Sequence, residues 1–127
     1  MIAMNELLIE ETQYTPSIKM SPEGQIEIKG KSYPENTFEF YKPVMVWLTD
    51  YFVQDSVPSL KVKFEITYFN SSSSKLFFDF FDLLNEHKDS VGITIDWCYD
   101  EENESAMEAG EDFIDDFPDL SIKLVTV

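Results

Sequence analysis

The sequence predicts an α/β fold in two layers: a mixed β-sheet with about three helices, mainly on one face. Two segments, residues 60–68 and 91–97, alternate apolar and polar residues as a strand with one buried face does. In the first, the side chains expected on the buried face are Leu60, Val62, Phe64, Ile66 and Tyr68. Helical segments separate these strands, an order that favours parallel neighbours joined by right-handed crossovers. Strands of a sheet that is covered on both faces read as continuous apolar runs. The strands here do not, so we place the helices on one face.

The first third of the chain predicts three short strands and then a helix. The strands are expected at residues 7–10, 17–20 and 25–29. The helix begins near residues 34–36, and Pro43 predicts a kink or a delayed regular start. Two apolar stripes give this helix a wide buried face: Phe38, Tyr41, Met45, Leu48 and Phe52, and then Phe40, Val44, Trp47 and Tyr51. Pro58 is expected to end the region.

The rest of the chain predicts two further strand–helix units and a last strand. The strand at residues 60–68 leads into a polar turn at 70–74 and a helix at 75–86. The strand at 91–97 leads into an acidic helix at 101–116, and the last strand begins at Leu120. The buried face of the helix at 75–86 is expected to consist of Leu76, Phe77, Phe80, Leu83 and Leu84. The predicted order is βββαβαβαβ, and residues 1–127 form a single domain.

Composition restricts the class of partner. The net charge of −16 repels a nucleic-acid backbone and an anionic membrane surface. We therefore expect a protein partner, with neither nucleic acid nor membrane involved. The chain has one cysteine, no apolar stretch of about 20 residues and no basic region before the short apolar run at residues 7–9. These features predict a cytoplasmic protein.

No pattern in the sequence predicts catalysis, a cofactor or a metal site. His87 is expected at a helix C-terminus, where the helix dipole favours it. Cys98 follows Trp97 in a strand and is expected to be packed. Acidic residues from Asp100 to Glu111 match part of a calcium-loop spacing, but Ser105 stands where that loop requires glycine. We therefore predict a protein that is not an enzyme and has no cofactor.

The polar segment Asn70–Ser74 is the candidate site. It lies where a strand ends and a helix begins, and one capping residue would suffice there. The segment is either a loop with redundant caps or a phosphoacceptor, since a helix N-terminus stabilises phosphate. Phe78 and Phe81 stand at or beyond the edge of the predicted buried arc. They are either core periphery or an apolar patch for a protein partner.

Several segments resemble, in order and with compatible spacing, the SiaC family of bacterial regulatory phosphoproteins. The more specific are Tyr33-Pro34-Glu35-Asn36 and the Asn70-Ser71-Ser72 turn. The match covers nearly the whole chain and includes Thr12-Gln13, Thr15-Pro16, Ser32, Tyr68-Phe69, Ser73, Lys75, Trp97-Cys98-Tyr99-Asp100 and Ala109-Gly110-Glu111-Asp112-Phe113.

The resemblance implies a STAS-like fold and a partner-switching function. It implies an anti-sigma-like Ser/Thr protein kinase, a PP2C-like phosphatase, and an effector that the unphosphorylated form binds and activates. In SiaC-like systems this effector is a diguanylate cyclase, which links the switch to cyclic-di-GMP and biofilm formation. The alternative is a constitutive adaptor or an anti-sigma-factor antagonist without a cyclase partner.

The resemblance also assigns the candidate residues. The family's acceptor hydroxyl maps onto Ser71, with Ser72 and Ser73 as the alternatives. Partner contacts are expected around this turn and along the helix that follows it. The predicted partner-binding residues are Asn70, Ser72, Phe78, Phe81, Tyr33, Pro34, Glu35 and Asn36.

Overall fold

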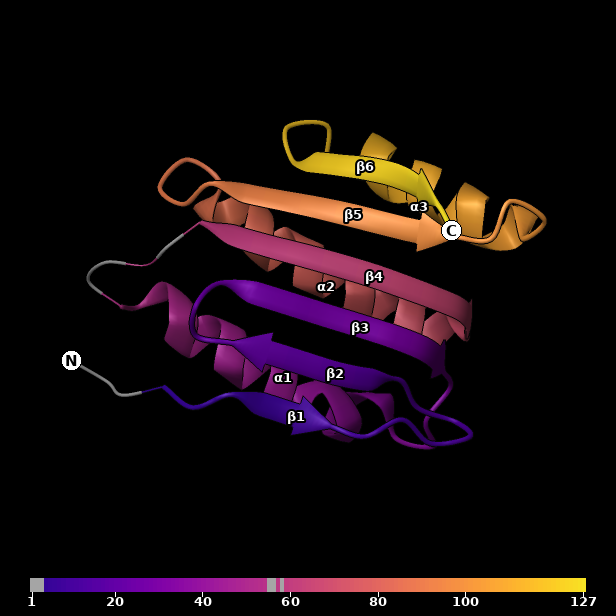
Figure 1. Ribbon diagram of the computed structural model, residues 1–127, viewed down its shortest axis with the longest axis horizontal. Helices are drawn as coiled ribbons and strands as arrows, with labels where there is room; N and C mark the ends of the chain where they lie inside the picture. Colours follow the sequence, from indigo (N-terminus) through magenta and orange to yellow (C-terminus); the bar gives the residue numbers. More distant parts are fainter. Residues whose placement is uncertain (1–3, 55–56, 58) are drawn as a thin grey trace.

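The computed structural model describes residues 4–54, 57 and 59–127, and its element order is the predicted βββαβαβαβ (Figure 1). The elements are β1 (Leu7–Ile9), β2 (Ser17–Ser21), β3 (Gln25–Ser32), α1 (Thr37–Phe52), β4 (Leu60–Phe69), α2 (Ser71–His87), β5 (Ile93–Tyr99), α3 (Glu104–Asp116) and β6 (Ser121–Thr126). Pro58 lies outside the described residues. Within the described part of the chain, no helix is long and apolar enough to cross a bilayer.

The six strands form one mixed sheet in sequence order. β1, β2 and β3 pair antiparallel, whereas β3, β4, β5 and β6 pair parallel. All three helices cover the same face of the sheet (Figure 1). The predicted two-layer α/β architecture with a mixed sheet is therefore confirmed.

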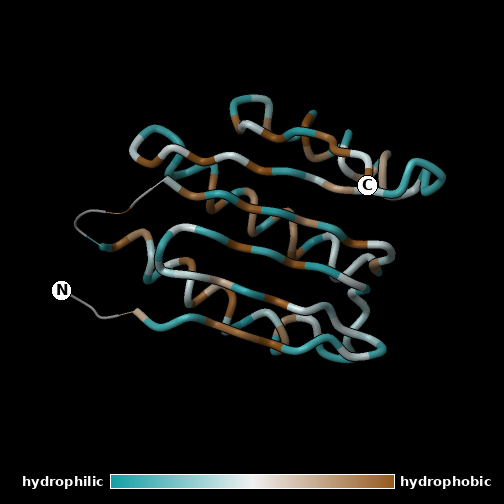
Figure 2. Tube along the Cα trace, viewed as in Figure 1, coloured by the Kyte–Doolittle hydropathy of each residue, from teal (hydrophilic) through white to brown (hydrophobic). Residues whose placement is uncertain are grey.

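The core fills the space between the sheet and the helices, and hydropathy alternates along the strands accordingly (Figure 2). Phe64 of β4 and Trp97 of β5 are fully buried and stack with ring centroids 5.5 Å apart. The indole N–H of Trp97 donates a hydrogen bond of 2.8 Å to the carbonyl of Ala106 in α3. This bond satisfies a polar group that would otherwise be costly to bury.

α1 differs from its prediction in which side chains it buries. The helix begins at Thr37, capped by Asn36, and Pro43 does not delay its start. Its buried residues are Thr37, Tyr41, Val44, Trp47, Leu48 and Tyr51. Phe38 was expected in the core but is 70% exposed. At 100° per residue it lies outside the arc centred on Val44 and Leu48, on the flank towards α2.

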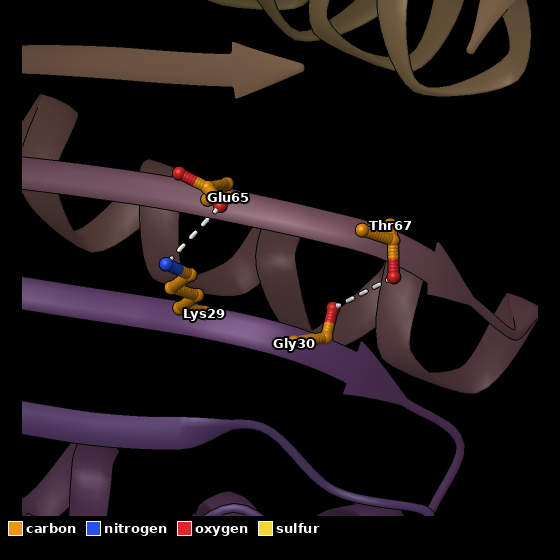
Figure 3. Close-up of polar contacts among 4 residues, drawn as sticks. All are labelled: Lys29, Gly30, Glu65 and Thr67. Atoms are coloured by element: carbon orange, nitrogen blue, oxygen red, sulfur yellow. Dashed lines mark hydrogen bonds and ion pairs between the residues drawn. The ribbon is translucent and has the colours of Figure 1, made fainter. Parts of the chain in front are cut away.

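A β-bulge at the end of β3 and β4 overturns the prediction for Tyr68. The register passes from Gly30 opposite Ile66 to Lys31 opposite Tyr68, which leaves Thr67 as the extra residue. Figure 3 shows the Thr67 hydroxyl donating to the Gly30 carbonyl at 3.4 Å. The bulge turns Tyr68 away from the helices, so its side chain is 56% exposed rather than buried.

Gly30 is required at this bulge. Its φ of +130° is unfavourable for residues with a Cβ. A Cβ there would also lie 3.1 Å from the Glu11 carboxyl carbon and 3.2 Å from Pro16 Cα. One residue earlier, Lys29 pairs with Glu65 across the strands at 3.5 Å (Figure 3).

Candidate functional site

α2 begins earlier than predicted, and its first turn consists of the four serines. Asn70 has extended backbone angles (φ −84°, ψ 174°), and its side-chain oxygen accepts the N–H of Ser73 at 2.9 Å. Its carbonyl accepts the N–H of Ser74 at 3.0 Å. Asn70 alone therefore caps the helix, and Ser71 is its first residue. The prediction of a polar turn up to residue 74 is wrong because one cap suffices.

Ser73 points into the protein and is 0% exposed. Its hydroxyl donates to the Ser32 carbonyl at 3.0 Å, and the Ser32 hydroxyl lies 2.7 Å from Ser73 Oγ. The Tyr41 hydroxyl of α1 completes this buried network through Ser32 Oγ at 2.5 Å. Burial raises the pKa of the Tyr41 phenol well above its usual range. A phosphate does not fit here without opening the network, so Ser73 is not a surface acceptor.

Ser71 and Ser72 are both exposed, but they lie on different sides of α2. Ser71 lines a shallow groove of about 600 Å³ between α2 and α3, together with Ser74, Lys75 and Phe78 of α2. Ser72 precedes Leu76 by one helical turn and so lies on the flank towards α1. The first N–H groups of a helix have no intrahelical acceptor. The N–H groups of Ser71 and Ser72 precede the capped N–H of Ser73, so they are the donors that a helix start offers to a phosphate on Ser71.

The groove beside Ser71 is apolar at its floor and acidic at its far wall. Phe78 is 42% exposed and packs against Phe117 with ring centroids 4.9 Å apart. The α3 wall contributes three carboxylates, and Lys75 is the lysine among the lining residues. The carboxylates are Glu108, Asp112 and Asp116. Phe78 is thus accessible on the surface, as its predicted partner contact requires.

Phe81 is not part of this surface, and its prediction as an exposed contact is wrong. Its side chain is 0% exposed and lies against Phe113 of α3, with ring centroids 4.7 Å apart. Phe64 of β4 lies 5.2 Å away on its other side. The docking of α3 widens the buried arc of α2 beyond the one that the α2 sequence alone predicts.

The segment from Tyr33 to Asn36 adjoins the turn but is only partly exposed. Pro34 is buried, so its expected partner contact is not available on the surface. Glu35 and Asn36 are exposed, and the Asn36 side chain caps α1 by accepting the Glu39 N–H at 3.1 Å. Tyr33 is half-buried.

Sequence reasoning missed an exposed tyrosine cluster beside the turn. Tyr33 packs edge-to-face between Tyr14 and Tyr68, with centroid separations of 5.3 Å to each. Tyr14 is 52% exposed and Tyr68 56% exposed. The alternation pattern predicts a buried Tyr68. It cannot predict the bulge, because a bulge depends on the pairing with the neighbouring strand as well as on the strand's own sequence.

The two side chains considered for catalysis, those of His87 and Cys98, are packed against the rest of the fold. His87 stacks on Phe52 with ring centroids 4.1 Å apart. Cys98 is buried, and burial raises the pKa of its thiol, with Lys63 opposing the shift. Among the described residues, no group of three or more histidines, cysteines and carboxylates is placed to hold a metal ion.

Ser71 is thus an accessible serine at a capped helix N-terminus, beside a groove that contains the exposed Phe78, and a helix N-terminus is a place where a phosphate is stabilised. A family model described as "SiaC family regulatory phosphoprotein" matches residues 9–127, and the chain therefore belongs to this family. The resemblance on which the sequence prediction rested is confirmed.

Known proteins of Pseudomonas aeruginosa are similar over almost the whole chain. An uncharacterized protein of strain UCBPP-PA14 is 36% identical over 115 residues, which span 89% of this chain and 90% of that protein. The structure of SiaC superposes with a TM-score of 0.89 at 30% identity, covering 98% of this chain and 100% of SiaC. A crystal structure of the diguanylate cyclase SiaD in complex with its activator SiaC matches with a TM-score of 0.88 at 32% identity. The match covers 95% of this chain and 99% of the matched chain.

Proposed function

We propose that this protein, when unphosphorylated, binds and activates a diguanylate cyclase, and that phosphorylation of Ser71 ends the complex. The observation that carries the proposal is the position of Ser71: exposed, first in α2, and lining a groove with the exposed Phe78. The similarity to SiaC, which has been solved bound to the cyclase SiaD, supports the choice of effector.

A phosphate on Ser71 would be tolerated by the free protein. It adds about −1.5 to −2 charges at neutral pH, and the free N–H groups and dipole of α2 stabilise charge of that sign. Lys75, one turn further along α2, is the nearby cation. The carboxylates of Glu108 and Asp112 line the opposite wall and repel a phosphate in the groove. The helix N-terminus stabilises the phosphate and the carboxylates disfavour the groove. We therefore expect the phosphate to stay at the start of α2 and the fold to remain intact.

The same phosphate would not be tolerated under a docked partner. A partner that packs on Phe78 and Ser71 would remove water from the anion, and burying an unpaired charge costs several kcal/mol. About 1.4 kcal/mol is a tenfold change in affinity, so part of this cost dissociates a micromolar complex.

The protein itself has no catalytic role in this scheme. A Ser/Thr protein kinase that resembles anti-sigma factors phosphorylates Ser71, and a PP2C-like phosphatase removes the phosphate. The cycle takes place in the cytoplasm. The sequence resemblance supports both enzymes, and the accessibility of Ser71 is what each of them requires.

The test combines mass mapping with effector binding. After incubation with the cognate kinase, the phosphate is expected on Ser71 and absent from Ser71→Ala. Ser71→Ala should bind and activate the cyclase constitutively, and Ser71→Asp should bind it poorly. Ser121→Asp is the matched control, because Ser121 is an exposed serine at the start of β6. Equal cyclase binding by phosphorylated and unphosphorylated protein would end the proposal, whereas phosphate on Ser72 would move the site.

A further inference from the structure

Lys75 is the cation nearest to Ser71 in the sequence, and the two residues share one flank of α2. Side chains four residues apart on a helix are neighbours, with Cβ atoms about 5–6 Å apart. Both residues line the groove between α2 and α3, whereas Ser72 does not. The Lys75 side chain therefore lies one helical turn from the hydroxyl that would carry the phosphate.

The Lys75 ammonium forms no ion pair with any of the described residues. In that part of the chain, the lysines that form ion pairs are Lys29, with Glu65, and Lys88, with Asp89. The Lys75 side chain is exposed and belongs to neither pair. It is therefore available to an anion that appears on the same flank of the helix.

The other charged groups that line this groove are carboxylates of α3. Glu108, Asp112 and Asp116 form the wall opposite α2 and repel an anion that enters the groove. On the α2 side, Lys75 is the one charged residue of the lining. A phosphate on Ser71 therefore has one favourable position, over the first turn of α2, between the free N–H groups of the helix and the Lys75 ammonium.

The start of α2 lacks the negative charge that the starts of the other two helices have. α1 has Glu39 in its first turn and α3 has Glu104, whereas the first turn of α2 contains no acidic residue. An anion in this place is favoured by the helix dipole. An anion four residues before a lysine is also the better orientation of such a pair. A phosphate on Ser71 meets both conditions.

We propose that Lys75 holds the phosphate of Ser71 in an ion pair along one turn of α2. This inference rests on the proposed function and adds to it the residue that positions the phosphate. The pair keeps the phosphate on the helix surface and favours its doubly charged form at neutral pH. Phosphorylation then reorganises two side chains beside Phe78, those of Ser71 and Lys75, rather than one.

The test uses the full chain with phosphoserine incorporated at position 71 during translation, so that it does not depend on a kinase. Phosphorus NMR follows the second ionisation of the phosphate, whose ordinary pKa is about 6. Lys75→Gln should raise this pKa by about half a unit, because an adjacent positive charge favours the dianion. Lys75→Arg keeps the charge and should leave the pKa near its wild-type value.

Lys88→Gln is the matched control for the phosphate titration. It removes the same charge from the same helix, but at the C-cap of α2. That position lies about 25 Å from Ser71 along the helix. Exposed charges so far apart are screened at physiological ionic strength. The phosphate pKa of Lys88→Gln should therefore equal that of the wild-type chain.

Melting temperatures separate the ion pair from a purely structural role of Lys75. With an unmodified serine at position 71, Lys75→Gln should melt like the wild-type chain, because Lys75 then belongs to no ion pair. With phosphoserine, the wild-type chain should melt about 2 °C higher than Lys75→Gln. Equal losses in the two states would show that Lys75 acts through the fold and would overturn the proposal.

The remaining outcomes distinguish this inference from the proposed function. A phosphate pKa that Lys75→Gln leaves unchanged, or that Lys88→Gln shifts equally, would overturn the ion pair, whereas phosphate mapping and cyclase release at Ser71 would be unaffected. A phosphate on Ser71 that responds to Lys75→Gln but does not release the cyclase would support the ion pair and reject the proposed function.

Discussion

The main-chain carbonyl of Ser32, at the end of β3, accepts two hydrogen bonds from the start of α2: the hydroxyl of Ser73 at 3.0 Å and the N–H of Asn70 at 3.1 Å. The last residue of β3 thereby fixes where β4 ends and α2 begins. Because Ser73 is held inwards, the helical period turns Ser71 and Ser72 outwards. Ser71, the proposed phosphorylation site, is therefore positioned by a buried hydrogen bond of Ser73, two residues further along α2.

Removing the Ser73 hydroxyl should therefore destabilise the fold. Ser73→Ala leaves the buried Ser32 hydroxyl without one partner, which costs about 1–2 kcal/mol. Ser73→Asp should cost more, because it buries a charge. Urea unfolding measures both losses. Ser72→Ala, at an exposed position, is the control and should stay within about 0.5 kcal/mol of wild type. A Ser73→Ala protein as stable as wild type would contradict the network.

Tyr41 should make stability fall in alkaline solution. Burial raises the pKa of its phenol, with the hydrogen bond to Ser32 opposing the shift. Below about pH 10 both folded and unfolded states keep the proton. Above it the unfolded state loses the proton first, so the free energy of unfolding decreases as pH rises. Urea midpoints measured from pH 8 upwards should decline less steeply in Tyr41→Phe, although Tyr51, whose pKa burial also raises, maintains part of the slope.

The same alkaline series has a clear negative outcome. Parallel declines in wild type and Tyr41→Phe would show that the Tyr41 phenol ionises alike in both states. At neutral pH, Tyr41→Phe removes one hydrogen-bond partner of the Ser32 hydroxyl and should cost about 1 kcal/mol. The loss of stability at neutral pH reports the hydrogen bond alone, because the phenol is protonated in both the folded and the unfolded state at that pH.

The parts of the fold that the sequence could predict are those that depend on local periodicity. Leu60 to Ile66 alternate because one face of β4 is buried, and this pattern located the strand. Tyr68 broke the pattern because Thr67 bulges against β3, which is a property of two strands. Phe38 was misplaced because two apolar stripes on α1 left the centre of the buried arc undetermined.

The candidate site was predictable to the level of the turn but not of each side chain. Five consecutive capping residues allowed any of several helix starts, and only the structure shows that Asn70 is the cap. That choice fixes the helical phase, which buries Ser73 and exposes Ser71. Phe81 was assigned to the surface because the packing of α3 over α2 is a tertiary contact.

Gly110 should be intolerant of a side chain. An added Cβ would lie 2.6 Å from both Trp97 Cδ1 and Leu124 Cδ2. Trp97 cannot retreat, because it is fully buried and bonded to Ala106. Gly110→Ala should lose about 1–3 kcal/mol in spite of alanine's better helix propensity. Gly92→Ala is the control, since its Cβ would meet Ser59 at an ordinary 3.6 Å. Equal melting temperatures for the two variants would show that α3 can move away from the sheet.

Phe78 and Phe81 provide a final comparison, since they are the same residue type three positions apart on α2. Phe78→Ala removes a half-exposed ring that packs on Phe117, so we expect a stability loss of about 1 kcal/mol. Phe81→Ala empties a fully buried site and should cost about 3–5 kcal/mol. Cyclase binding should show the opposite order: Phe78→Ala weakens it at least tenfold, whereas the folded fraction of Phe81→Ala binds normally. Calorimetric titration at a temperature where both variants are folded makes the comparison. Unchanged binding by Phe78→Ala would remove the groove beside Ser71 from the interface.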